Sequence, residues 1–332
     1  MEGKVVPYFR SASLRSQSTA TIVWAGDQRT DMEKDNGLPV VIPIGLGLAA
    51  TGFLFFAHDI GGYQFVGNSP TTIRTKETLF RWTELGAFTP VMRTHHRIKV
   101  RDNWAIDSDA ETTAHWKRYA ELHVRLYPYL RGLAVRAVNE ERLIWTPLGL
   151  VHPDDEAVWS IRDQLYVGDA IILLAPVVEA GSTSRAVRLP AARFVPWSPA
   201  AGEAILPEVI GPATIEVVAP LGEIPAFLRA GGIVPMAKDA ALTLFENVPG
   251  VPGLETTRSD RVVYVALGAD GEFREEDGAL YTLRGTGTVT AKLGLDASGA
   301  LDVTGNATVT GDGFTLTLGG HPPARRTRVV FR

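Results

Sequence analysis

Short apolar runs, each followed directly by polar residues, recur through the first part of the chain. Four such runs cover residues 5–9, 21–24, 52–57 and 88–92. Their unbroken hydrophobicity is typical of strands that are buried on both faces. Residues 72–86, between the last two runs, carry apolar side chains at helical spacing, which predicts an amphipathic helix. Strands that alternate with helices predict a parallel sheet joined by crossovers.

A second helical pattern follows the fourth run. Residues 109–140 predict one long helix, which Pro128 is expected to kink because proline lacks a backbone N–H group. Ser108 and Glu111 have the spacing of a capping box at its start. In this region, polar residues follow the carboxyl end of each predicted strand, where a (β/α)8 barrel holds its active site. A closed barrel needs eight strands, so four runs predict a partial barrel.

The pattern changes from about residue 144. Helical periodicity disappears, and short apolar runs alternate with glycine-containing turns. From residue 261 onward, apolar and polar positions alternate between Gly-Asp turns, which predicts an antiparallel β module. We therefore expect an α/β plus all-β chain. Its predicted parts are the C-terminal half of a (β/α)8 TIM barrel over residues 1–143 (about the last four β/α units), a proximal β domain over 144–237 and a distal β domain over 238–332, the last two sandwich-like.

Residues 37–57 carry no charge and are long enough to span a bilayer. Pro39, Pro43 and several glycines interrupt this segment, and proline breaks or kinks helices. The pattern favours a buried helix followed by a buried strand, and no membrane partner is expected.

Composition narrows the classes of function. The 332 residues include 33 basic and 37 acidic side chains, a net charge of −4. Nucleic-acid surfaces need clustered Lys and Arg, so no nucleic-acid partner is expected. The absence of cysteine excludes disulfides, thiolate metal sites and cysteine nucleophiles. The first ten residues lack the apolar core of a signal peptide, which favours a cytoplasmic location.

Asp27 follows the second apolar run, close to Trp24. A carboxyl group beside an indole is partly desolvated, which favours its protonated form and suits a general acid. The alternative is that Asp27 caps the next helix. Its position alone does not separate the two.

Asp59 follows the third run and precedes Gly61 and Gly62. Paired glycines permit a sharp turn or the close approach of a ligand. The alternative is a tight turn in which the Asp59 side chain satisfies backbone N–H groups. His95 follows the fourth run and could bind a substrate hydroxyl, although a single histidine is more often structural.

Residues 270–278 are acidic and contain glycine. They lack the alternating spacing of acidic residues that a calcium loop requires. A solvated hairpin turn is the better interpretation.

Several separated motifs, in the same order along the chain, resemble glycoside hydrolase family 31, the retaining α-glucosidases. Residues 9–12 resemble the segment whose strand-end arginine contacts the sugar in the −1 subsite, which corresponds to Arg10. Trp24-Ala25-Gly26-Asp27 resembles the acid/base segment, with Asp27 at the acid/base position. The turn from Asp59 to Tyr63 is similar to one that lines the pocket of the family.

The resemblance continues beyond these strands. Residues 93–95 resemble a segment whose histidine, here His95, binds hydroxyls of the same sugar. Residues 164–177 and 227–236 resemble the start and the end of the proximal β domain of the family, and residues 275–278 resemble an acidic turn of its distal β domain.

Within the family, residues 24–28, 58–63 and 88–95 look nearest to the sulfoquinovosidase-like branch, in which the tyrosine at position 63 helps to hold a sulfonate. The sequence His96-Arg97-Ile98 departs from the acidic and glycine residues of that branch. Sulfosugar specificity is therefore an alternative to α-glucosidase specificity.

The resemblance implies hydrolysis of O-glycosyl bonds in an α-glycoside, a carbohydrate substrate, and no metal or organic cofactor. It implies that Asp27 is catalytic and that Arg10, Trp24, Asp59, Tyr63 and His95 bind the substrate. Family members carry their nucleophilic aspartate on an earlier strand, and none of the 26 residues before Asp27 is aspartate.

We therefore expect residues 1–332 to be inactive alone. A separate chain or self-association would complete the barrel. A different interpretation is a non-catalytic fragment that binds sugar or depends on a partner.

Overall fold

The first part of the chain is a small parallel sheet. The computed structural model describes residues 6–13, 15–63, 73–95, 102–200, 207–243, 248–253, 257, 259–288 and 293–332. Strands β1 (Tyr8–Phe9), β2 (Ile22–Trp24) and β3 (Phe56–Ala57) lie side by side in that order, all parallel. Single parallel bridges then join Ala57 to Val91 and Ile60 to Thr94. The four apolar runs are therefore neighbours, as expected, but the fourth forms bridges instead of a full strand.

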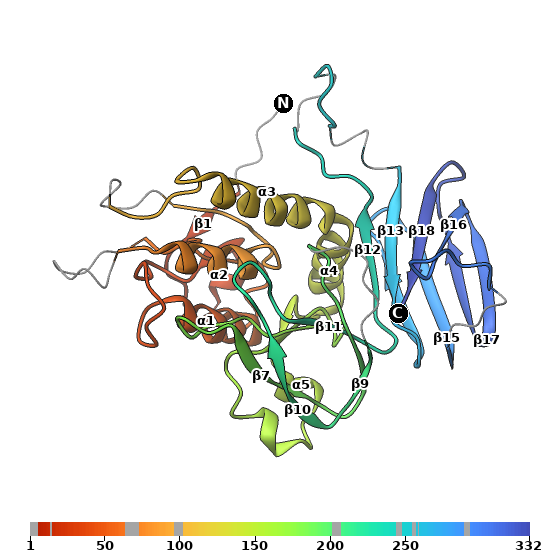
Figure 1. Cartoon of the computed structure of the whole chain (residues 1–332), viewed down its shortest axis with the longest axis horizontal. Helices are drawn as coiled ribbons and strands as arrows, with labels where there is room; N and C mark the ends of the chain where they lie inside the picture. The colour runs from red at the N-terminus through yellow and green to blue at the C-terminus, as the bar shows by residue number, and fades with distance from the viewer. Residues whose placement is uncertain are drawn as a thin grey trace.

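Helices cover this sheet (Figure 1). Helix α1 (Leu38–Ala50) connects β2 to β3, and α2 (Lys76–Gly86) follows β3. The 13 residues of α1 include Pro43 in the helix interior. No helix in the described ranges is long and apolar enough to cross a membrane. The predicted buried helix followed by a strand is confirmed.

The predicted long helix is two helices. Helix α3 (Ala110–Arg125) and α4 (Tyr127–Glu140) are separated at Leu126, and Pro128 lies in the first turn of α4. Proline fits there because first-turn N–H groups have no partner within the helix. The predicted capping box is wrong, because Asp109 is the N-cap of α3 and its carboxylate accepts from the Thr112 backbone N–H at 2.6 Å.

The second part of the chain forms a six-stranded antiparallel sheet, here called the proximal sheet. A two-stranded ribbon of β7 (Ser184–Leu189) and β10 (Ala213–Val218) accompanies it, and the short helix α5 (Leu148–Val151) precedes β5. In order across the sheet, its strands are β4 (Trp145–Thr146), β5 (Leu165–Val167), β6 (Ile172–Leu174), β11 (Ala226–Arg229), β8 (Arg193–Pro196) and β9 (Val209–Ile210).

The last part of the chain contains two sheets, here called the distal sheets, at the opposite end of the molecule from α1 and α2 (Figure 1). β13 and β18 pair in parallel, so the expectation of a wholly antiparallel module is wrong at this pair. β12 belongs to the first of these sheets, although the predicted boundary of 237/238 assigns it to the proximal part. The strands are β12 (Ile233–Ala237), β13 (Arg261–Val265), β18 (Arg326–Phe331) and β16 (Ala300–Thr304) in one sheet, and β14 (Gly271–Arg274), β15 (Leu280–Thr288) and β17 (Ala307–Gly319) in the other.

One continuous hydrophobic core joins these parts. It contains Trp82 of α2, Tyr129 of α4, Leu174 of the proximal sheet and Val263 of the distal sheets, all buried. The partial barrel therefore does not pack alone, because the β parts cover its helices.

A buried arginine fastens α2 to the proximal part. The side chain of Arg81 is 1% exposed and forms an ion pair with Glu84, whose Oε1 accepts from the Gly222 backbone N–H at 3.0 Å. Backbone carbonyls supply most of the hydrogen-bond acceptors of this guanidinium, so its binding depends on the path of the main chain more than on any one side chain. Arg81 donates to the carbonyls of Ser182, Ala219, Pro220 and Glu223 at 2.7–3.2 Å.

Replacing Arg81 with methionine should lower the free energy of unfolding by about 3–5 kcal/mol, because Glu84 would stay buried without its charge partner. Urea denaturation would measure the loss. Arg326→Met is the matched control, since Arg326 is 71% exposed and its pair with Asp260 should contribute about 1 kcal/mol or less. Equal losses in the two variants would contradict the assignment.

Candidate active site

Polar side chains gather where the parallel strands end. Arg10 directly follows β1, Asp27 lies three residues after β2, and Asp59 lies two residues after β3. Arg93 and His95 flank Thr94, which forms the last parallel bridge. Because neighbouring parallel strands end at the same edge, these residues share one end of the sheet.

The first charged pair joins β1 to β2. Arg10 Nη2 donates to Asp27 Oδ2 at 2.8 Å, with the Arg10 side chain 60% exposed and the Asp27 side chain 20% exposed. The cap of α1 is Gly37, which makes no side-chain capping bond. Asp27 therefore does not cap the next helix, and its carboxylate stays at the strand ends in reach of solvent.

The second charged pair joins β3 to the segment after it. Arg93 Nη1 lies 3.1 Å from Oδ1 of Asp59, whose side chain is 1% exposed. Burial raises the pKa of Asp59, and the charges of Arg93 and His95 oppose that rise. The negative charge of Asp27 raises the same pKa further, so the two carboxylates interact across the site.

The turn after Asp59 needs its glycines for packing. The backbone carbonyl of Asp59 accepts from Gly62 N–H at 2.8 Å, so main-chain atoms close the turn while the carboxylate pairs with Arg93. Gly62 has φ of +73°, and a Cβ there would collide with the Arg29 carbonyl oxygen. Tyr63 N–H then donates to the Gln28 carbonyl at 2.9 Å. The glycines thus allow the turn after Asp59 to approach the segment that follows Asp27.

Aromatic rings surround the Asp59–Arg93 pair. Tyr8 stacks on Trp24 with ring centres 4.8 Å apart and planes 13° apart. Arg93 donates to the Tyr8 hydroxyl at 2.5 Å, and its guanidinium lies 4.8 Å from the centre of the Tyr8 ring. Burial raises the pKa of Tyr8, so this hydroxyl stays protonated. Trp24 is therefore placed beside the second charged pair.

Tyr63 and His95 meet edge to face, with ring centres 4.5 Å apart. The structure thus brings the six predicted residues together in three neighbouring groups. Arg10 contacts Asp27, Arg93 contacts both Trp24 and Asp59, and Tyr63 contacts His95. Their roles in binding and catalysis stay predictions.

Sequence reasoning assigned no role to Arg93 or Tyr8. Arg93 stands two residues before His95 in the motif already recognised, and Tyr8 stands two residues before Arg10. That spacing places residues on the same side of a strand, which is the signal that could have found them.

His58 fixes the strand end that carries Asp59. Its side chain is fully buried, and its Nδ1 accepts from Trp82 Nε1 of α2 at 2.9 Å. Burial lowers the pKa of His58 to about 3, and the charge of Arg93 contributes to the same shift. His58 is therefore neutral at physiological pH and acts as a fixed acceptor between α2 and the candidate site.

Comparison with known proteins relates this arrangement of a barrel fragment, strand-end carboxylates and trailing β sheets to a family of glycoside hydrolases. Residues 3–133 match the TIM-barrel domain of glycosyl hydrolases family 31, and residues 141–234 match the C-terminal domain of the same family. The chain belongs to glycoside hydrolase family 31, and the predicted class of fold is confirmed.

Individual relatives support this assignment. A sulfoquinovosidase of Escherichia coli is 37% identical over 69% of this chain and 32% of its own length. Neutral alpha-glucosidase AB of Mus musculus is 32% identical over 67% of this chain and 23% of its own length. The chain therefore spans a third or less of the length of these curated relatives.

A solved structure covers the distal sheets as well. The cycloalternan-forming enzyme of Listeria monocytogenes, in complex with a pentasaccharide substrate, aligns with 96% of this chain and 33% of its own, at a TM-score of 0.70. With 17% sequence identity, this likeness concerns the fold alone.

The burial of His58 predicts how stability depends on pH. The unfolded chain takes up a proton near pH 6.5, whereas the folded chain does so near pH 3. The contribution of neutral His58 is thus present above pH 6.5 and is lost as the pH falls toward 3. His58→Gln keeps an acceptor for Trp82 and cannot be protonated, so the stability of wild type relative to this variant should fall by about 2 kcal/mol between pH 7 and pH 5.

Urea denaturation at the two pH values measures this difference. Burial also lowers the pKa of His123, which is bonded to the Ala87 carbonyl, so His123→Gln should show a pH dependence of the same sign and serves as a comparison. A difference between wild type and His58→Gln that does not change with pH would contradict the burial of a neutral His58.

Proposed function

We propose that this chain supplies the acid/base side of a retaining α-glycosidase of family 31. The observation that carries the proposal is the ion pair of Arg10 with Asp27 at the carboxyl ends of β1 and β2. This pair holds a partly exposed carboxylate at the end of the sheet where barrel enzymes bind their substrates. An α-glucoside is the proposed class of substrate.

In this mechanism Asp27 acts twice. Its protonated carboxyl group gives a proton to the glycosidic oxygen as the C–O bond breaks and a second carboxylate forms an ester with the sugar. A water molecule then attacks the anomeric carbon, the bond from that carbon to the second carboxylate breaks and the free sugar is released, while Asp27 takes the proton from that water. Arg10 orients the Asp27 carboxylate between these two steps.

Asp59 does not have the features of the second carboxylate. Its side chain is 1% exposed and paired with Arg93, whereas a nucleophile must approach the sugar carbon directly. We infer that Asp59 and Arg93 form the floor of the sugar pocket, with Trp24, Tyr63 and His95 around it. The nucleophile would come from barrel strands outside residues 1–332.

The missing strands also bear on assembly. Within the described residues, β1 and the Thr94 segment are the edges of the parallel sheet. Exposed strand edges promote pairing with further strands. We propose that these edges bind either the remaining half barrel on a separate chain or the same edges of a second copy, which would cover them without supplying a nucleophile. Residues 1–332 alone have at most a partial sugar pocket. The division at residues 143 and 237 and the cytoplasmic location stay proposals.

A sulfosugar is the second candidate substrate. The sulfoquinovosidases of Escherichia coli and of Agrobacterium fabrum are 37% and 36% identical to this chain over their matched segments, and Tyr63 stands where that branch uses a tyrosine. Relative turnover of an aryl α-sulfoquinovoside and an aryl α-glucoside by the completed barrel would decide between them.

Asp27→Asn in a completed barrel tests the acid/base role. Turnover of substrates with poor leaving groups should fall by about 10²–10⁴-fold, because these need protonation, and activated aryl glycosides should lose less in the first step. Added azide should partly restore turnover of the activated substrates, since it needs no general base. A small and equal loss for both kinds of substrate, with an unchanged pH profile, would refute the role.

Residues 1–332 alone should show no measurable turnover of either aryl glycoside, because removing one catalytic group typically costs several orders of magnitude in rate. A purified chain assayed with both substrates checks this. Robust turnover that is lost in Asp59→Asn would instead make Asp59 the nucleophile.

A further inference from the structure

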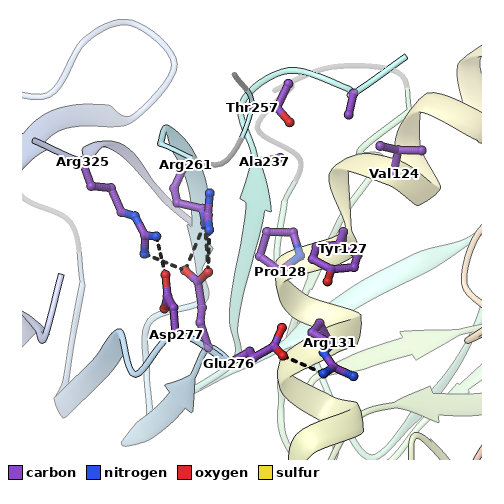
Figure 2. Close-up of a pocket in the computed structure, with 12 residues that line it drawn as sticks. Val124, Tyr127, Pro128, Arg131, Ala237, Thr257, Arg261, Glu276, Asp277 and Arg325 are labelled. Atoms are coloured by element: carbon purple, nitrogen blue, oxygen red, sulfur yellow. Dashed lines mark hydrogen bonds and ion pairs between the residues drawn. The ribbon is translucent and has the colours of Figure 1, made fainter. Parts of the chain in front are cut away.

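A cavity lies between α4 and the distal sheets, away from the ends of the parallel strands that carry the candidate active site. Its volume is about 360 Å³, which falls in the range of small-molecule sites. Figure 2 shows Val124, Tyr127, Pro128 and Arg131 on the helical side, and Arg261, Asp277 and Arg325 on the distal side. None of these residues belongs to the candidate active site.

The distal wall is built on a buried carboxylate. Glu275 is 3% exposed and accepts from Arg261 Nε and Nη2 at 2.9–3.1 Å. The Tyr281 hydroxyl donates to the same carboxylate at 2.6 Å, and Arg325 Nη1 lies 3.6 Å from it. The expectation of a solvated turn over residues 270–278 is therefore wrong at Glu275, because Arg261 at the start of β13 and Arg325 just before β18 compensate its charge inside the protein.

The rim of the cavity consists of half-exposed charged groups. Arg131 of α4 donates to Glu276 at 2.6 Å, with side chains 44% and 45% exposed. Arg325 donates to Asp277, which is 41% exposed. Although burial opposes ionisation, the bond from Arg325 lowers the pKa of Asp277 below its usual value. Asp277 is thus ionised at neutral pH and accepts a hydrogen bond from Arg325, as Glu276 accepts one from Arg131.

The charges of the cavity balance. Three guanidinium groups and three carboxylates line it, and each guanidinium is paired with a carboxylate. An ionic ligand of either sign would meet as many like charges as opposite ones. A neutral molecule with several hydroxyl groups fits better, because each hydroxyl can accept from a guanidinium or donate to a carboxylate.

The helical wall adds an aromatic surface. Tyr127 is 45% exposed and lines the cavity beside Pro128. A sugar ring has an apolar C–H face and a rim of hydroxyls, so it matches a wall that is aromatic on one side and polar on the other.

We propose that this cavity binds one unit of a neutral saccharide, as a second carbohydrate site that does not depend on the proposed catalytic role. Such a site would hold a glycan against the distal sheets while the chain's strand-end site, once completed, acts on another unit.

Ligand-observed NMR titration of residues 1–332 with maltotriose tests the proposal. Wild type should bind maltotriose, and Tyr127→Ala should weaken binding by about five- to tenfold, while Tyr127→Phe keeps the ring and should stay within about twofold. Glucose 6-phosphate should bind no better than glucose, because the cavity has no excess positive charge. A thermal melt confirms that each variant is folded.

Two sets of variants locate the bound sugar. Trp159→Ala removes another exposed aromatic side chain, 58% exposed and outside the cavity, and should leave binding unchanged. Asp27→Asn and Tyr63→Ala should likewise have no effect. Glu276→Gln, at a rim position whose side chain is 45% exposed, should weaken binding by about tenfold through loss of a charged acceptor.

The proposal fails if wild type does not bind maltotriose, if Tyr127→Ala and Glu276→Gln bind as wild type does, or if binding is lost in Asp27→Asn and Tyr63→Ala instead. The last result would place the sugar at the strand ends and so support the proposed function while refuting the second site.

Discussion

The architecture depends on the burial of one guanidinium group, that of Arg81, among carbonyls of the proximal part. A buried cation is costly unless each of its N–H groups finds an acceptor. The two Nη groups of Arg81 donate to Glu84 and to four carbonyls that lie 101–142 residues away along the chain, whereas its Nε has no acceptor among the described residues. The neighbouring residue, Trp82, donates to His58 on the other side of the same helix. Helix α2 therefore contacts both the proximal part and the strand end that carries Asp59, through two adjacent residues.

The candidate site follows from the geometry of parallel strands. Each charged pair joins the ends of neighbouring elements: Arg10 with Asp27 across β1 and β2, and Asp59 with Arg93 across β3 and the next segment. Each carboxylate thus has its own cation in the absence of substrate. The two environments still differ, because Asp27 is in reach of solvent whereas Asp59 is buried. This difference suits a carboxyl group that exchanges protons and one that shapes a pocket.

The local pattern of apolar and polar residues predicted much of this arrangement. The features that it did not predict depend on contacts between residues far apart in the sequence. Continuous apolar runs indicated the positions of β1, β2 and β3, since a strand buried on both faces leaves that mark in any sequence. Motif order placed Arg10, Asp27 and Asp59 at one end of the sheet. The partners of Arg81 and Glu275 could not be predicted, because backbone carbonyls have no sequence signature and the arginines that contact Glu275 are distant from it along the chain. The same limit made residues 270–278 look solvated.

The break between α3 and α4 also affects the cavity beside the distal sheets. Pro128 cannot donate a hydrogen bond to the preceding turn, so the helix ends at Arg125 and a new one begins at Tyr127. With the break, α4 packs against β12, and Tyr127 opens the helix where it faces the charged turn after β14. Pro128, which the sequence predicts to kink the helix, thus also places the Tyr127 ring among the charged groups that line the cavity.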